Sequence, residues 1–231
     1  MAPRFALYAA PPADHPLHDF AARWLGWDPE SGESPAAQPA AGLSAVRISE
    51  ITAEPRRYGF HGTLKPPFRL KDGTDEAMLI VALEKFASQH APVRLPVLQM
   101  AVLGSFLALR PSTPCPEIDA LAGACVKAFD AFRAPPSEAE LARRRSAGLT
   151  PRQETNLVQW GYPYVFEDFR LHFTLTDRIH DAAERDAVLA HLTAQTAPLL
   201  RRQFSVDEIC LFVQMDSGAP FRIAGRYRLA G

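Results

Sequence analysis

Cysteine is scarce in this sequence, and charge of neither sign is in excess. The three cysteines, Cys115, Cys125 and Cys210, include no C-x-x-C pair and are odd in number, so we expect reduced, buried thiols and no disulfide framework. The 25 basic and 26 acidic side chains leave a net charge of −1. The overall charge therefore favours neither a nucleic-acid backbone nor an anionic membrane, and an anionic substrate requires a local site.

Long apolar segments are also absent. No stretch approaches the roughly 18 uncharged apolar residues of a membrane span, and the apolar run at the start of the chain is too short for a signal peptide. We therefore expect a cytoplasmic protein that does not contact a membrane. Apolar residues still make up 47% of the 231 residues, enough for a substantial core in one large domain or two fused lobes.

Two short motifs stand out against this background. The stretch "RYGFHGTLKPPF" contains His61 and Thr63, and "FRLHFTLTDR" contains His172 and Thr174, so His-x-Thr-Leu occurs twice. Residues i and i+2 of a β-strand point to the same face, so each motif presents an imidazole beside a hydroxyl. The large apolar residues between and beyond them point the other way, toward packing helices.

The predicted elements after the two motifs follow the same order. Each motif strand is followed by a helix and then by two strands, with helices predicted at about 74–89 and 181–196 and strands at about 93–102, 105–110, 204–214 and 220–229. The motifs lie about half the chain apart, which indicates an internal duplication. We therefore predict a single bilobal domain, 1–231, of the α+β class, in which antiparallel sheets form a central cleft with helices outside.

The predicted lobes are unequal. Lobe one covers roughly 45–112, and lobe two covers roughly 165–231 together with an N-terminal strand at 4–10. Between them, at roughly 135–160, two capping-box pairs predict two short helices that have no counterpart in the first half: Ser137 with Glu140, and Thr150 with Gln153. This insertion either covers the cleft or packs on an edge. The aromatic run that follows it, from Trp160 to Phe166, is interpreted as core packing rather than as a wall for a base or ribose.

A pair of imidazoles facing one cleft suits acid–base chemistry. Histidine titrates near pH 6.5, so one ring can accept a proton while the other donates one. In phosphodiester cleavage, one of His61 and His172 activates water or a hydroxyl and the other protonates the departing oxygen. The hydroxyls of Thr63 and Thr174 can donate hydrogen bonds to non-bridging phosphate oxygens. The sequence does not assign which histidine is the acid.

A metal site is the main competing interpretation of two histidines. Catalytic zinc usually has three protein ligands, and the sequence contains no H-E-x-x-H or clustered His, Asp and Cys pattern that completes such a set. We therefore predict neither a metal nor another cofactor. A single His-x-Thr arises often by chance in ordinary strands, but two copies at matched positions favour a functional site.

The motifs resemble those of the two-histidine (2H) phosphoesterase superfamily, whose members carry two H-x-T/S motifs in a duplicated α+β fold. The blocks "RYGFHGTLKPPF", "WGYPYVFEDFRLHFTLT" and "FALYAAPP" followed by "PLHDFAARWLGWD" are similar to a bacterial branch found with phosphonate-utilisation operons. The resemblance spans nearly the whole chain. It implies metal-independent action on cyclic phosphates or phosphodiesters, with His61 and His172 as the catalytic pair and Thr63 and Thr174 as phosphate ligands.

Three further residues are candidates for substrate binding. Lys65 lies at i+4 from His61 on the same nominal strand face, where a cation can hold the reacting phosphate or a second one, although it can equally be a solvated strand end. Thr176 occupies the matching position after His172. Tyr58 is predicted to face away from the site unless the strand bends, but it lies where a groove rim can form.

Three functional hypotheses follow. The first is a hydrolase that opens a small cyclic phosphate or phosphodiester, with a phosphorylated ribose from phosphonate breakdown as the implied substrate. The second is an RNA-end enzyme, a 2′,3′-cyclic phosphodiesterase or a ligase-like enzyme; the near-neutral charge argues against a long polynucleotide. The third is a non-catalytic nucleotide-binding module. The sequence does not predict the oligomeric state.

Overall fold

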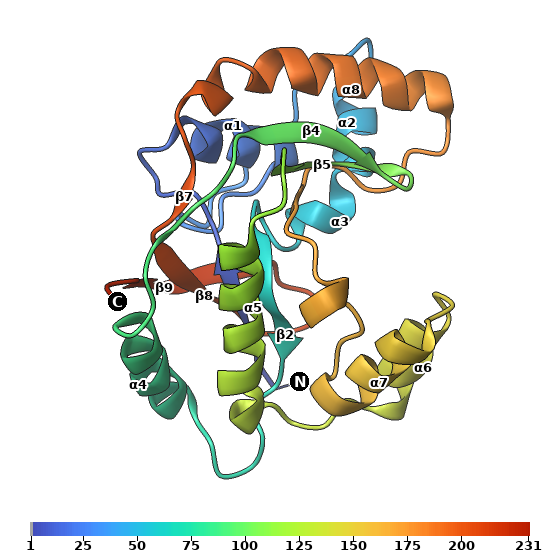
Figure 1. The fold of residues 1–231 in the computed structure, drawn as a ribbon. Helices are drawn as coiled ribbons and strands as arrows, with labels where there is room; N and C mark the ends of the chain where they lie inside the picture. Colours follow the sequence, from blue (N-terminus) through green and yellow to red (C-terminus); the bar gives the residue numbers. More distant parts are fainter. Residues whose placement is uncertain (1) are drawn as a thin grey trace.

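The protein is an α+β molecule built on one antiparallel sheet. The computed structural model describes residues 2–231, and Figure 1 shows their arrangement. Within these residues, seven strands form a continuous sheet in the order β4-β5-β6-β2-β1-β8-β9, and β3 and β7 pair separately. The strands are β1 (Arg4–Ala9), β2 (Gly62–Phe68), β3 (Val93–Arg94), β4 (Leu98–Leu103), β5 (Phe106–Pro111), β6 (Phe173–Thr174), β7 (Ser205–Val206), β8 (Glu208–Gln214) and β9 (Arg222–Arg228). The predicted α+β class with antiparallel strands is confirmed.

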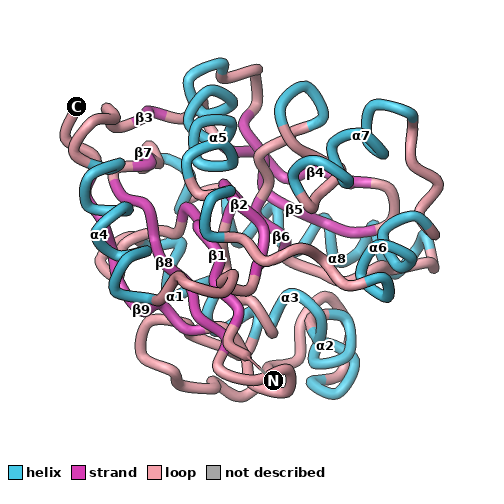
Figure 2. The backbone as a smooth tube through the Cα atoms, turned by 90° about the horizontal axis from the view of Figure 1, so that it is seen from below, coloured by secondary structure: helices cyan, strands magenta, loops and turns pink. Residues whose placement is uncertain are grey.

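The helices lie outside this sheet. They are α1 (Pro16–Leu25), α2 (Ala45–Ile51), α3 (Ala53–Arg56), α4 (Glu76–Ala87), α5 (Pro116–Ala128), α6 (Glu138–Arg145), α7 (Pro151–Trp160) and α8 (Ala182–Thr196). Helix α5 packs against β2, α4 against β9 and α8 against β4. Figure 2 shows the strands running through the middle of the molecule, with α6 and α7 at one side.

The two motif strands lie side by side at the centre of the sheet. β2, from the first half of the chain, pairs with β1 and, through it, with β8 and β9, whereas β6, from the second half, pairs with β5. β2 and β6 pair with each other at Gly62 and Phe173. The motif strand of each half thus pairs with strands from the other half. Because β2 and β6 also pair with each other, the two predicted sheets are joined into one. The lobe boundaries at 45–112 and 165–231 stay a prediction.

Gly62 allows these two strands to approach closely. A β-carbon at this position would lie 2.8 Å from Cδ1 of Leu171 and 3.0 Å from the ring of Phe173. Such contacts are shorter than packed side chains allow. The glycine inside the first His-x-Thr motif is therefore a packing requirement at the junction of β2 and β6.

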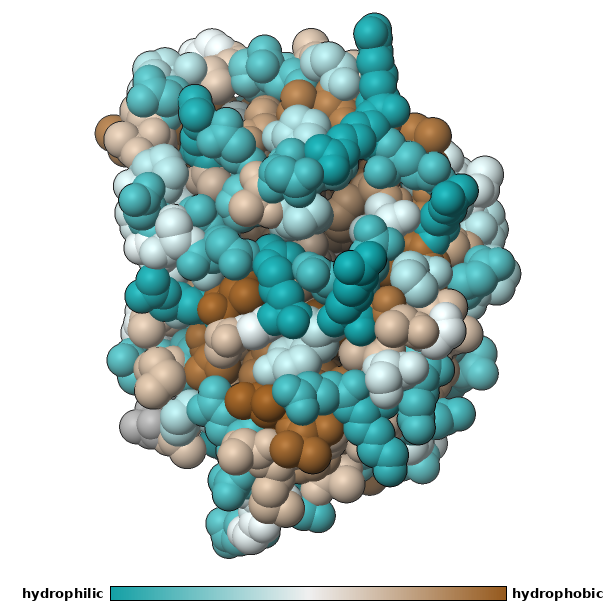
Figure 3. Space-filling view, turned by 90° about the vertical axis from the view of Figure 1, so that its left-hand side faces the viewer, coloured by the Kyte–Doolittle hydropathy of each residue, from teal (hydrophilic) through white to brown (hydrophobic). Residues whose placement is uncertain are grey.

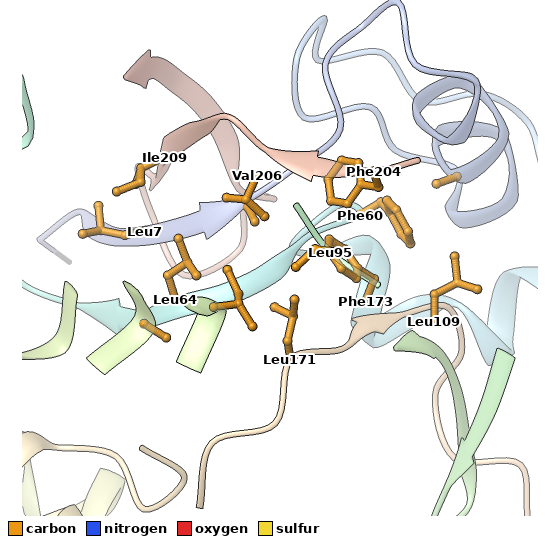
Figure 4. Close-up of a cluster of buried hydrophobic side chains, with 14 of the residues drawn as sticks. Leu7, Phe60, Leu64, Leu95, Leu109, Leu171, Phe173, Phe204, Val206 and Ile209 are labelled. Carbon is orange, nitrogen blue, oxygen red and sulfur yellow. The ribbon is translucent and has the colours of Figure 1, made fainter. Parts of the chain in front are cut away.

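The main hydrophobic core lies on the face of the sheet that points away from the threonines. It contains Leu64, Phe173 and Leu175, all at most 2% exposed, and Figure 4 shows Leu64, Leu171 and Phe173 pointing toward one another across β2 and β6. A smaller cluster occupies the other face, and its buried members are Ala6, Tyr8, Cys210, Phe212 and Phe221. The predicted alternation around both motifs is therefore what the structure shows.

The insertion forms the two helices that its capping signals predict. In α6, Ser137 and Glu140 make a reciprocal capping box, and in α7 Thr150 and Gln153 do the same. Each pair satisfies backbone N–H groups that have no intrahelical partner. Helices α2, α3 and α5 were not predicted from the sequence; α5 begins at Pro116 without a side-chain cap, so it lacks the capping signal that marks α6 and α7.

Two other expectations concern the thiols and membrane-spanning segments. All three cysteines are free and buried, as predicted. None of the described helices is long and apolar enough to span a bilayer. Figure 3 shows one face of the molecule on which hydrophilic side chains predominate and hydrophobic ones gather in patches in the lower half.

Candidate active site

The register of β2 and β6 brings the two motifs together. Gly62 pairs with Phe173 in an antiparallel ladder, so one step along each strand sets His61 opposite Thr174 and Thr63 opposite His172. The two histidines are then diagonal neighbours on one face, roughly 7–8 Å apart in a regular ladder. Each one is the residue immediately before its strand. The register thus sets each histidine opposite the threonine of the other motif.

The two imidazoles are held in the same way. Nδ1 of His61 lies 2.8 Å from the carbonyl oxygen of Gly59, and Nδ1 of His172 lies 2.8 Å from the carbonyl oxygen of Arg170. In both cases the partner is the backbone two residues upstream. Because a carbonyl only accepts, Nδ1 carries the proton and donates, and Nε2 of each neutral ring is the acceptor. Both histidines therefore present the same tautomer, with Nε2 available for proton transfer.

His61 is the more enclosed of the two rings. It stacks on Tyr8 with ring centroids 3.8 Å apart and an interplanar angle of 20°, and Tyr58 lies 5.9 Å from it on another side. Burial, with a smaller contribution from His172, lowers the pKa of His61 to about 4 against the opposing effect of the Gly59 hydrogen bond. His61 is therefore neutral at physiological pH.

The threonine hydroxyls are free to bind a ligand. Thr63 and Thr174 are each partly exposed, and across residues 2–231 neither side-chain oxygen is engaged in a hydrogen bond with another protein group. Thr63 pairs with Tyr8 across β1 and β2, which places it on the face of the smaller cluster. Both hydroxyls can donate to an anion on this face.

The motif residues line two adjoining pockets. His61, Thr63 and Thr174 line one of about 310 Å³, and His172 and Thr63 line another of about 260 Å³. The two share Thr63, Pro66 and Tyr162. The histidines thus open onto neighbouring hollows that meet at Thr63, where a bound phosphate can contact both sides.

Lys65 does not join this group. The pairing of β1 with β2 shifts register between Leu7 and Tyr8, so that Lys65 pairs with Leu7 while Thr63 pairs with Tyr8. Such a bulge interrupts the alternation of faces, and Lys65 turns to the core side, where it is 1% exposed. Its Nζ donates to the carbonyl oxygen of Val126 at 3.1 Å. The expectation that Lys65 shares the face of His61 is therefore wrong.

Thr176 and Tyr58 take different positions as well. Thr176 lines the pocket of His61, but it is buried, and its hydroxyl accepts a hydrogen bond from the backbone N–H of Leu107 at 2.9 Å, so it also fixes β5 beside the second motif. Tyr58 lines the same pocket as His61 and stacks on Phe221 at 5.2 Å. The chain turns between Tyr58 and His61 at Gly59, whose φ is +71°, and this turn brings Tyr58 to the pocket.

Several lining residues carried no distinct sequence signal. Tyr8 lies in the first strand and supports the His61 ring, a contact between residues far apart in the chain. The aromatic run after the insertion supplies Tyr162, Tyr164 and Phe166 to the pocket that contains His172, so it forms a wall of that pocket, contrary to its interpretation as core. Arg144 of α6 lines the pocket of His61. The insertion thus contributes to the site.

Among residues 2–231, no three His, Cys, Asp or Glu side chains are grouped so that they could hold a metal ion.

Comparisons with known proteins identify relatives of this chain. Two curated proteins, both named "Ribose 1,5-bisphosphate phosphokinase PhnN", are 39% and 37% identical to it: the protein of Janthinobacterium sp. (strain Marseille) matches over 94% of this chain, and that of Laribacter hongkongensis (strain HLHK9) over 95%. These matches cover 49% and 50% of the two relatives. The chain thus spans about half the length of the curated relatives it matches.

Two solved structures are similar to this chain at low sequence identity. A structure titled "Crystal structure of phosphoesterase" is 13% identical with a TM-score of 0.45, and Escherichia coli LigT complexed with 3′-AMP is 14% identical with a TM-score of 0.46; each match covers 100% of both chains. Residues 63–222 match the family model described as "Protein of unknown function (DUF1045)". Since that match covers most of the residues and both threonines of the motifs, the chain belongs to the DUF1045 family.

Proposed function

We propose that this chain is a metal-independent phosphoesterase that opens a small cyclic phosphate, or cleaves a related phosphodiester, by two-histidine acid–base catalysis. One imidazole Nε2 takes a proton from water as the water oxygen bonds to phosphorus. The bond from phosphorus to one ring oxygen breaks, and the other imidazole gives that oxygen a proton. The product is a phosphomonoester with a free hydroxyl. One ring has gained a proton and the other has lost one, and transfer of that proton between the two rings through solvent or product restores the starting state.

The matched anchoring of the two rings supports this proposal most directly. Both rings direct Nδ1 to the carbonyl two residues upstream, which leaves Nε2 as the unengaged ring nitrogen, and each of the two rings lines a pocket. General acid–base catalysis requires a fixed ring with one accessible nitrogen. The same arrangement on adjacent strands of one sheet gives two such nitrogens on one face.

The roles of the two histidines follow from their surroundings. His61 is neutral at physiological pH because burial and the nearby His172 lower its pKa to about 4, so it is the base that receives the proton from water. His172 then supplies the proton to the leaving oxygen. The hydroxyls of Thr63 and Thr174, each opposite the other motif's histidine, donate to the non-bridging oxygens as negative charge accumulates.

The proposed substrate is a phosphorylated ribose. The curated relatives are named for a kinase of ribose 1,5-bisphosphate, but this chain contains no G-x-x-x-x-G-K-[ST] stretch of the kind that cradles nucleotide phosphates. We therefore do not propose a P-loop kinase activity for it. An enzyme that opens a ribosyl cyclic phosphate would supply a phosphorylated ribose to such a kinase.

A cyclic phosphate panel in the presence of a chelator tests the function. We expect hydrolysis of at least one ribosyl cyclic phosphate, with the same kcat/KM in EDTA as in added Mg²⁺ or Zn²⁺. The measurement is phosphorus NMR of the product, which also gives the position of ring opening. Tight binding of the panel with no turnover of any member would instead leave a non-catalytic module, and loss of turnover in EDTA would remove the two-histidine mechanism.

Removing a threonine hydroxyl tests the phosphate contacts. Valine has nearly the shape of threonine, so Thr63→Val and Thr174→Val should fold normally. Each should lower kcat/KM by about 10²-fold, the usual cost of one donor to a transition-state oxygen. Thr193→Val is the matched control, because the Thr193 hydroxyl is exposed and donates only within α8. Equal rates for all three variants would contradict the proposed contacts.

A further inference from the structure

We propose that the arginines beside the active site form a subsite for a second phosphate of the substrate. This inference rests on the proposed function and narrows its substrate class to small molecules with two phosphates, one of them reacting. The subsite lies where α6 and α7 meet the end of β2. It includes Arg143 and Arg144, which lie in the insertion and outside the two His-x-Thr motifs.

Five arginines surround one small pocket at this place. The pocket measures about 50 Å³, and its charged lining residues are Arg4, Arg69, Arg133, Arg143, Arg144 and the single acid Glu140. A hollow of this size suits a compact group and not a base. Guanidinium groups match phosphate oxygens in shape and charge, often with two parallel hydrogen bonds. The lining therefore has the chemistry of an anion site.

The positive charge there is only partly compensated. Arg69 pairs with Glu140 through two hydrogen bonds of 2.9 and 2.8 Å, and Arg133 pairs with Asp130 at 2.7 Å. Arg4 contacts the neutral amide oxygen of Gln214 at 2.7 Å. No ion pair involves Arg143 or Arg144 within residues 2–231. Three of the five arginines thus lack an acidic partner in the described part of the chain, and a phosphate dianion would supply one.

Arg144 connects this pocket to the catalytic one. It lines both the arginine pocket and the pocket of His61, as does Pro67. Its guanidinium lies over the ring of Tyr162, 4.7 Å from the ring centroid, and Tyr162 also lines both motif pockets. A guanidinium stacked on an aromatic ring keeps its in-plane N–H donors free. Arg144 can therefore donate to an anion that lies between the two hollows.

The arginine subsite takes the role that the sequence suggested for Lys65, which was to hold a second phosphate. A cation near His61 was expected to hold a second phosphate, but Lys65 turns to the core. The arginine pocket supplies cations instead, and two of its five arginines, Arg143 and Arg144, come from α6 of the insertion, which has no counterpart in the first half of the chain. Selection of a doubly phosphorylated substrate is thus a function of the α6–α7 insertion.

Binding of two matched ligands tests the subsite without requiring turnover. The probes are ribose 1,5-bisphosphate and ribose 1-phosphate, which differ only by one phosphate, and affinity is measured by calorimetry at fixed salt. We expect the wild type to bind the bisphosphate at least tenfold more tightly. Arg144→Gln and Arg143→Gln should each reduce that ratio by about 10-fold, and Arg143→Gln, whose side chain lines only the arginine pocket, should leave ribose 1-phosphate binding nearly unchanged.

Arg145→Gln is the matched control on the same helix. Arg145 pairs with Glu154 at 2.7 Å and lines none of the three pockets, so its replacement should leave both affinities as in the wild type. Equal affinity of the wild type for the two probes overturns the subsite, and so does an equal loss in Arg145→Gln and Arg144→Gln, which would indicate a non-specific effect of charge. The catalytic proposal fails separately, if no cyclic phosphate is hydrolysed while the affinity ratio still depends on Arg144.

Discussion

Replacing either motif histidine should abolish most of the activity. We expect His61→Ala and His172→Ala each to lower kcat by about 10²- to 10⁴-fold, the usual contribution of a positioned acid or base. The double variant should lose little more than the worse single variant, because the two rings act as a unit. The measurement is the steady-state rate on the best cyclic phosphate of the panel, with KM determined for each variant.

The Tyr8 contact complicates the alanine variant of His61, since alanine also removes a stacked ring from a partly buried position. His61→Asn separates the two effects. An asparagine amide N–H can replace the Nδ1 donor toward Gly59, but no atom replaces Nε2. This variant should be nearly as stable as the wild type and as inactive as His61→Ala. A fully active His61→Asn would remove His61 from the chemistry.

His90 provides the matched histidine control. Its Nδ1 also lies 2.8 Å from a carbonyl oxygen, that of Phe86, and its ring stacks on Phe86 at 3.8 Å. It lines neither motif pocket. His90→Ala therefore removes a similarly held imidazole from another place, and we expect full activity. An equal loss in His90→Ala and His172→Ala would show that the losses come from stability.

Local patterns in the sequence predicted the parts of the site that depend on one strand at a time. The i, i+2 rule placed each histidine beside its threonine and each neighbouring leucine in the core, and the capping boxes placed α6 and α7. These signals are contained in a few consecutive residues. They require no knowledge of what packs against them.

The remaining features depend on pairings between distant segments. The exchange of β2 and β6 between the halves is set by which strands pair, and a two-residue strand such as β6 has almost no periodic signal of its own. The Tyr8 stack, the approach allowed by Gly62 and the reach of Arg144 all join residues far apart in the sequence. The bulge opposite Leu7 reverses the face of one residue, Lys65, and only the pairing with β1 reveals it.

The new position of Lys65 gives the second large expectation, which concerns stability. Helix α5 ends at Ala128, so the carbonyl of Val126 is among those at the helix end without an intrahelical partner. The Lys65 ammonium donates to that carbonyl and lies 3.7 Å from Asp130, a favourable place for a cation at a helix C-terminus. Lys65→Ala should therefore lower the free energy of unfolding by about 3 kcal/mol, because it removes these contacts and leaves a cavity.

Lys65→Met distinguishes the packing of the side chain from its charge. Methionine keeps the apolar stem, and Asp130 keeps Arg133 at 2.7 Å, so we expect a stability within about 1 kcal/mol of the wild type at pH 7. Lys85→Ala, at an exposed position on α4, should have no measurable effect. Denaturant unfolding curves of the three variants give these differences. A loss of kcat/KM in Lys65→Met at unchanged stability would return Lys65 to substrate binding.

The pH dependence of unfolding tests the burial of the charge itself. Burial lowers the pKa of Lys65 to about 8 from its usual 10.5, against the opposing effect of Asp130. Between these two values the unfolded chain holds more protons on this group than the folded one, so its contribution to stability rises with pH across that window. Wild-type protein should thus gain stability relative to Lys65→Met as the pH increases from 8 to 10.5. A constant difference over that interval would mean that water reaches the ammonium and that β2 does not turn Lys65 into the core.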